Sequence, residues 1–172
     1  MPFIQDWTDL LLRLLFATLV GLALGLDREL RGFDAGLRTH GLVAMSSAML
    51  TISGLLMFQQ LKDAGGDSDP LRVIQGLAQA IGFIAGGLIF VRGGDVMNMT
   101  TAAGLWTACA AGIAAGAGQF MLLGLATGLA ILLLTVVGFL EKWLPQRDRS
   151  EEKPGGAQKN SPANRRGRNG PD

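Results

Sequence analysis

Residues 120–140 read FMLLGLATGLAILLLTVVGFL, an apolar run without a charged residue. With a rise of about 1.5 Å per residue, a helix of this length crosses a hydrocarbon core of about 30 Å. Four further apolar stretches precede it, at residues 10–26, 37–58, 71–91 and 100–116. The pattern predicts an all-α integral membrane bundle of five transmembrane helices.

The basic residues predict how this bundle lies in the membrane. One set of connections carries most of them, namely Arg28, Arg31, Arg38, Arg92 and eight Lys and Arg residues beyond position 140. The other set carries Lys62 and Arg72, while Arg13 is expected to snorkel from the first helix to the outer surface. Because positive residues favour the cytoplasmic side, we expect the N-terminus outside and the C-terminus inside.

The composition divides the chain into two parts. Residues 1–140 form the predicted transmembrane domain. Residues 141–172 contain four prolines and many charges but few apolar residues, so they predict a disordered, basic cytoplasmic tail.

Several classes of protein are not expected. With one Cys and one His, the chain offers neither a disulfide framework nor a metal site rich in these residues, and we expect no cofactor. No pair of residues has the spacing of a nucleophile and its base, so no enzyme is expected. The one short basic cluster, in the tail, does not favour nucleic-acid binding.

Glycine pairs at G-x-x-x-G spacing occur in four of the stretches: Gly21 and Gly25, Gly82 and Gly86, Gly112 and Gly116, and Gly124 and Gly128. Such rows let helices approach closely, because helices in lipid associate through packing. We favour the interpretation that they hold one bundle together. The alternative is that one row faces outward, towards another copy or a partner helix.

Two polar stripes lie within the apolar stretches. Gln75, Gln79, Gly82 and Gly86 share one face of the third helix, and His40, Ser47, Thr51 and Gly54 share one face of the second. Both stripes are expected to face the bundle interior, with hydrogen bonds between helices favoured over a hydrated path. His40 is expected to be a satisfied interfacial histidine.

A charged hairpin joins the first two stretches. Its three acids and three arginines are Asp27, Arg28, Glu29, Arg31, Asp34 and Arg38. Mutual pairing would let these charges lie near the lipid headgroups. An ion-paired cap that fixes the angle between two helices is the favoured interpretation, and a ligand or partner site is the alternative.

Four motifs in order resemble the MgtC/SapB family of bacterial inner-membrane proteins. They are GLDRE at residues 25–29, AGLRTH at 35–40, IGFIAGG at 81–87 and TTAAGLW at 100–106. The resemblance implies signature or interaction residues at Asp27, Arg28, Glu29, Arg38, Thr39, His40, Gly82, Phe83, Gly86, Thr101, Ala102, Ala103 and Trp106. Virulence-associated members carry an ACT-like domain after the last helix, and we expect a short form without it.

The resemblance also implies a role. Family members are associated with adaptation to low Mg²⁺, with acid stress and with survival in host cells, and they are regarded as regulators of other membrane proteins. We therefore expect a multi-pass inner-membrane protein that contacts the lipid bilayer and other inner-membrane proteins, with another copy of itself as a further candidate partner. The alternative function is a small transporter of Mg²⁺ or another cation, with a polar path along Gln75, Gln79, Ser47 and Thr51.

Overall fold

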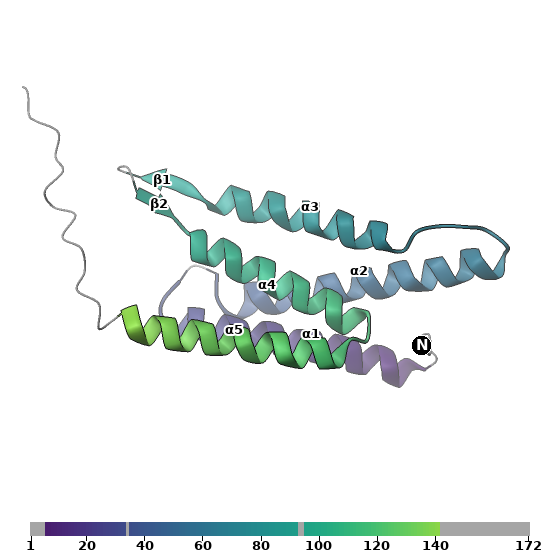
Figure 1. The fold of residues 1–172 in the computed structure, drawn as a ribbon, viewed down its shortest axis with the longest axis horizontal. Helices are drawn as coiled ribbons and strands as arrows, with labels where there is room; N and C mark the ends of the chain where they lie inside the picture. Colours follow the sequence, from purple (N-terminus) through teal and green to yellow (C-terminus); the bar gives the residue numbers. More distant parts are fainter. Residues whose placement is uncertain (1–5, 34, 93–94, 142–172) are drawn as a thin grey trace, which may run out of the picture.

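A computed structural model describes residues 6–33, 35–92 and 95–141, and Figure 1 shows them as a bundle of helices that run roughly parallel to one long axis. The five helices are α1 (Trp7–Leu30), α2 (Leu37–Asp63), α3 (Leu71–Leu88), α4 (Met99–Gly116) and α5 (Phe120–Glu141). The predicted all-α bundle of five helices is confirmed. The predicted tail lies outside the described residues.

Four of the described helices, α1, α2, α3 and α5, are long and apolar enough to cross a membrane. The remaining helix, α4, is built mainly of Ala, Gly and Thr, and half of its residues are buried. Small residues suit this position, because α4 lies between its neighbours and offers them a close approach.

The tightest packing joins α1, α2 and α4, whereas α3 packs chiefly against α4 and α5 lies along α4 and α1. In Figure 1, α3 and α5 lie on opposite sides of α4. The apolar part of α5 is almost entirely exposed, as is typical of a helix that faces lipid on most sides.

Two glycine rows explain the close contact in the centre. A Cβ atom on Gly21 would lie 2.6 Å from the carbonyl oxygen of His40, and one on Gly112 would lie 2.8 Å from the Cβ of Ser47. By contrast, Gly86, Gly124 and Gly128 have no atom within 4 Å of such a position. Two of the four rows therefore hold the bundle together, and the other two lie at least partly outside it.

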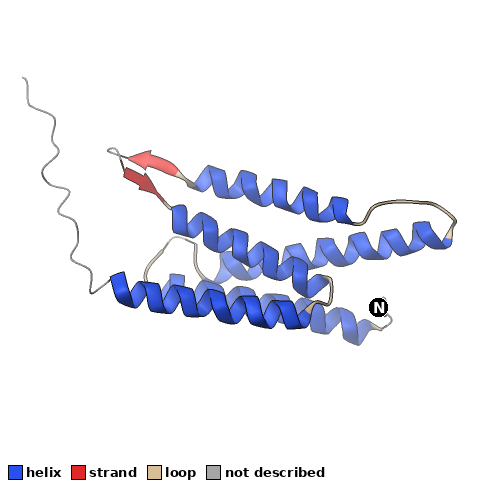
Figure 2. Ribbon diagram, in the orientation of Figure 1, coloured by secondary structure: helices blue, strands red, loops and turns tan. Residues whose placement is uncertain are grey.

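The third predicted stretch is too long at its C-terminal end. Helix α3 ends at Leu88, and β1 (Phe90–Arg92) pairs with β2 (Asp95–Met97) as a short antiparallel hairpin, which Figure 2 shows in red. The sequence between the strands is Gly-Gly, which is typical of two-residue hairpin loops, and the aromatic and β-branched residues before it favour a strand.

The turn between α4 and α5 is tight. Gly118 has a φ angle of 73°, and the amide of Gln119 donates to the carbonyl of Ala114 across 2.8 Å. Only a residue without a Cβ adopts this left-handed conformation at little cost. The turn brings α5 back alongside α4.

Candidate functional site

Arg28 lies near the end of α1, with only 4% of its surface exposed. Its guanidinium donates to the hydroxyl of Thr100 across 3.3 Å and to that of Thr101, both in the first turn of α4. The carbon of the guanidinium lies 3.9 Å from the centre of the Phe33 ring, a cation–π geometry. The Nε atom has no hydrogen-bond partner among the described residues.

His40, in the first turns of α2, is fully buried. Its Nδ1 atom lies 3.0 Å from the carbonyl oxygen of Gly36, whereas Nε2 has no partner in the described part of the chain. A Cβ atom on Gly104 of α4 would lie 2.9 Å from Nε2, so the ring is directed at α4. The expectation of a satisfied histidine is therefore wrong for one of its two nitrogen atoms.

Arg28 and His40 line one cavity of about 350 Å³ between α1, α2, α4 and α5. Thr100, Thr107 and Gly104 line it from α4, and Leu24 and Arg28 from α1. The α5 side of the cavity is apolar, with Leu129, Ala130, Leu133 and Leu134. The cavity thus combines a polar side with a hydrocarbon side.

The charged hairpin pairs less completely than predicted. Arg31 Nε contacts Asp27 Oδ1 at 2.8 Å, while the Glu29 carboxylate accepts a hydrogen bond from the amide of Leu37, the first residue of α2. Arg28 turns inward, Arg38 is exposed, and Asp34 lies outside the described residues. The Asp27 carboxylate forms an ion pair with Arg31, and the Glu29 carboxylate covers the start of α2. Neither forms an ion pair with Arg28, because residues adjacent in a helix point in different directions.

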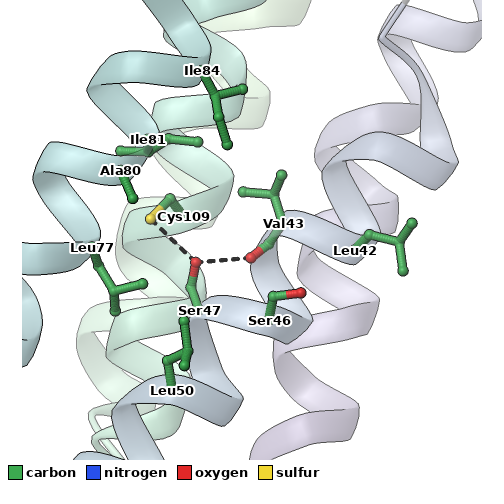
Figure 3. A pocket seen from close by; sticks show the side chains of 10 residues that line it. All are labelled: Leu42, Val43, Ser46, Ser47, Leu50, Leu77, Ala80, Ile81, Ile84 and Cys109. Carbon is green, nitrogen blue, oxygen red and sulfur yellow. Dashed lines mark hydrogen bonds between the residues drawn. The ribbon is translucent and has the colours of Figure 1, made fainter.

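The polar stripe of α2 faces the interior, as predicted. Ser47 and Thr51 are buried and donate to carbonyls one turn earlier in their own helix. Ser47 Oγ also lies 3.2 Å from the sulfur of Cys109 in α4. Ser47 and Cys109 line a cavity of about 250 Å³ between α2, α3 and α4 (Figure 3).

That cavity is mostly apolar. Apart from Ser46, Ser47 and Cys109, its lining residues are hydrocarbon side chains from α2 and α3, such as Leu42, Leu77 and Ile84 (Figure 3). Neither predicted glutamine lines it. The described residues also contain no group of three or more His, Cys, Asp or Glu placed to hold a metal ion.

The polar stripe of α3 does not face the interior, in contrast to the prediction. Gln75, Gln79 and Gly86 are exposed, and Gly82 is half-buried. Helix α3 instead buries Leu77, Ile81 and Ala85, one residue per turn. These apolar side chains fill the space beside α4 better than two amides do, because the facing part of α4 offers few hydrogen-bonding groups.

Two residues that the family resemblance singled out, Gly82 of α3 and Trp106 of α4, lie next to each other. The ring of Trp106 reaches Gly82, where a Cβ atom would lie 3.6 Å from it. Phe83 points away from the bundle, with 86% of its surface exposed. Thr39 is half-buried, and Ala102 is buried while Ala103 is exposed.

The expectation that Arg13 snorkels to the surface is wrong. Arg13 is buried, contacts Asp9 at 2.9 Å and donates to the carbonyl of Gly116 across 2.8 Å. A carbonyl at the end of α4 is a ready acceptor, because the last carbonyls of a helix lack partners within it. Arg13 therefore joins α1 to the turn before α5.

The structure brings Arg28, His40 and Thr101, predicted from separate motifs, to one place. Three residues of this place were not among those predicted, namely Phe33, Thr100 and Gly104. Phe33 lies two residues before the AGLRTH motif, while Thr100 and Gly104 lie within TTAAGLW. Gly104 could have been recognised from the sequence, because Gly104, Ala108 and Gly112 form a row of small residues at four-residue spacing.

Comparisons with known proteins agree with these motifs. The model of the MgtC family matches residues 14–143. The chain is 39% identical over 150 residues to protein SapB of Bacillus subtilis, covering 84% of this chain and 63% of that one. It is 39% identical over 102 residues to protein MgtC of Brucella abortus, covering 59% of this chain and 40% of that one.

A third relative is the YhiD protein of Escherichia coli, which is named as a candidate magnesium transporter. The identity is 33% over 129 residues, covering 74% of this chain and 60% of YhiD. The chain therefore spans about two fifths to three fifths of the length of these three relatives. No solved structure matches.

Proposed function

Because this chain belongs to the MgtC family of multi-pass bacterial inner-membrane proteins, we propose that it regulates other inner-membrane proteins during magnesium limitation and acid stress, through contacts of α3 with a partner helix. The magnesium link is supported by the name given to YhiD. The surface proposed for the contact is the α3 stripe, defined as Gln75, Gln79, Gly82 and Gly86.

The observation that carries this proposal is the outward direction of the stripe. Gln79 is the ninth of the 18 residues of α3 and is exposed, so a membrane that encloses α3 places this amide near mid-depth. An amide in hydrocarbon without a partner costs several kcal/mol, whereas one bonded across two helices stabilises their contact by roughly 0.6 to 2 kcal/mol. A partner helix with polar groups would satisfy Gln75 and Gln79.

The glycines beside these amides favour the same occupant. A Cβ atom added to Gly76, Gly86 or Gly87 would have nothing within 4 Å, so this side of α3 presents bare backbone. A second helix can approach such a surface closely, which strengthens both packing and hydrogen bonds.

A cation path receives less support from the geometry. The hydroxyls of Ser47 and Thr51 already donate to their own helix, and Gln75 and Gln79 lie away from the cavity that Ser47 lines. Mg²⁺ keeps several waters and takes oxygen ligands, which a mostly apolar cavity provides poorly.

The contact can be tested with a photoreactive amino acid at Gly86 in cells grown in low Mg²⁺. We expect an adduct with one defined inner-membrane protein, which Gln79→Leu abolishes together with growth in low Mg²⁺. The matched control is the same amino acid at Gly128, which is equally open but lies on α5. An adduct with the chain itself would assign the surface to a homo-oligomer, and an equal yield from Gly128 would contradict a specific surface.

The transport alternative is tested by Mg²⁺ flux into proteoliposomes. We expect no flux above that of empty vesicles for folded protein. Saturable uptake that Gln75→Leu and Gln79→Leu abolish would overturn the regulatory proposal and favour the transporter.

A further inference from the structure

The cavity between α1, α2, α4 and α5 contains two buried nitrogen atoms that lack partners in the described part of the chain, Arg28 Nε and His40 Nε2. We propose that this cavity binds an anionic phospholipid with a hydroxyl-bearing headgroup, the chemistry of phosphatidylglycerol. The phosphate would lie at Arg28, the hydroxyl at His40 and an acyl chain against α5. This proposal does not depend on the contact surface of α3.

The buried charge of Arg28 favours an anionic ligand. Within the described residues its guanidinium bonds only to hydroxyls, while the neighbouring Asp27 is paired with Arg31. A guanidinium keeps its charge in proteins, and a buried charge without a counter-charge is costly. A phosphate accepts from Arg with good geometry and would offset that cost.

The start of α4 adds to the attraction. Thr100 lies in the first turn of this 18-residue helix, and its N-cap residue, Asn98, makes no capping hydrogen bond with its side chain. The free amides and the positive end of a helix favour a negative group at this position. Arg28 and the start of α4 thus attract the same kind of ligand.

His40 indicates a second polar group on the ligand. Its Nδ1 atom faces the carbonyl of Gly36, which can only accept, so Nδ1 carries the hydrogen. In the neutral ring, Nε2 is then an acceptor and needs a donor. A headgroup hydroxyl is such a donor, whereas the choline headgroup has none.

The α5 side of the cavity indicates hydrocarbon. Leu129, Ala130, Leu133 and Leu134 line it, and α5 is the most exposed of the candidate spans. A soluble phosphate would leave this apolar surface uncovered, whereas an acyl chain would cover it. Exposure of α5 to lipid also gives a lipid a direct route to the cavity.

Lipid binding to the full chain in detergent micelles, measured by native mass spectrometry, tests the assignment. We expect phosphatidylglycerol to bind at least about tenfold more tightly than phosphatidylcholine, and Arg28→Gln to remove that preference. Arg38→Gln is the matched control, since it removes one positive charge from the same charged hairpin but is exposed and does not line the cavity. We expect it to change affinity by less than about twofold. Equal losses in both variants would overturn the site.

A second variant keeps Arg28 and fills the apolar part of the cavity. Ala130→Leu is expected to weaken phosphatidylglycerol binding severalfold, whereas Ala126→Leu, one turn earlier on an exposed position of α5, should leave it unchanged. Full binding in Ala130→Leu would overturn the placement of the acyl chain.

Competition with excess inorganic phosphate identifies the source of the anion. We expect phosphatidylglycerol to remain bound. Displacement of the lipid, with phosphate binding that Arg28→Gln abolishes, would overturn the lipid assignment in favour of a soluble phosphate.

Discussion

At the scale of single residues, the glycines of this chain fall into two kinds. Gly112 faces the backbone of α2 so closely that an added Cβ would meet the carbonyl of Ala44, whereas Gly128 faces no atom within 4 Å. Identical G-x-x-x-G spacing therefore carries two different roles, which only the rotation of each helix in the bundle decides.

Gly112→Ala should destabilise the fold by about 1 to 3 kcal/mol, because backbone on α2 cannot move aside as a flexible side chain can. Gly128→Ala should leave stability unchanged or raise it by up to about 1 kcal/mol, since alanine favours helix more than glycine does. Unfolding of both purified variants in mixed micelles gives the comparison. Equal losses would contradict the assignment of Gly128 to an open face.

At the scale of elements, Glu29 determines how α2 begins. Its carboxylate accepts from the amide of Leu37, and a Cβ on Gly36 would collide with that carboxylate. A residue with a Cβ at position 36 would therefore force the Glu29 carboxylate to shift from its place at the start of the helix.

Glu29→Ala should cost about 0.5 to 2 kcal/mol of stability, the range for loss of a helix cap. Glu29→Gln should cost less, because the amide oxygen still accepts. Arg38→Ala, in the same hairpin but exposed, should stay within about 0.5 kcal/mol of the wild type. A cost for Arg38→Ala equal to that of Glu29→Ala would indicate a general charge effect instead of a cap, as measured by the same unfolding experiment.

The helices could be predicted from hydropathy to within a few residues, and the starts of α2, α3 and α5 fall at Leu37, Leu71 and Phe120 as expected. The rotation of α3 could not. Hydropathy does not show which side of α3 packs against α4, because helices in lipid associate without a hydrophobic driving force, and the packing selects Leu77 and Ile81 instead of the glutamines. The cavity of Arg28 and His40 was equally out of reach, because its lining comes from four helices that are far apart in sequence.

At the scale of the whole molecule, the connections alternate between the two ends of the bundle. The α2–α3 connection lies at the end where α1 begins, and the β1–β2 hairpin lies at the opposite end, as Figure 1 shows. The positive residues predict that the hairpin end is cytoplasmic.

This orientation can be measured in a Cys109→Ser background. A cysteine at Ser68, in the α2–α3 connection, should react with an impermeant maleimide from the periplasmic side. Val96→Cys, on the exposed β2 strand, should react only after the inner membrane is opened. The reverse pattern of labelling would contradict an outer N-terminus.

The packing of α3 chiefly against α4 also has a consequence for synthesis on the ribosome. Since α4 follows α3 in the chain, α3 enters the membrane before its main neighbour does, and until then it can make only a slight contact with α2. Until α4 is inserted, α3 is surrounded mainly by lipid. Of the first three helices, the one with the exposed glutamines is therefore the one that depends most on α4 for its packing.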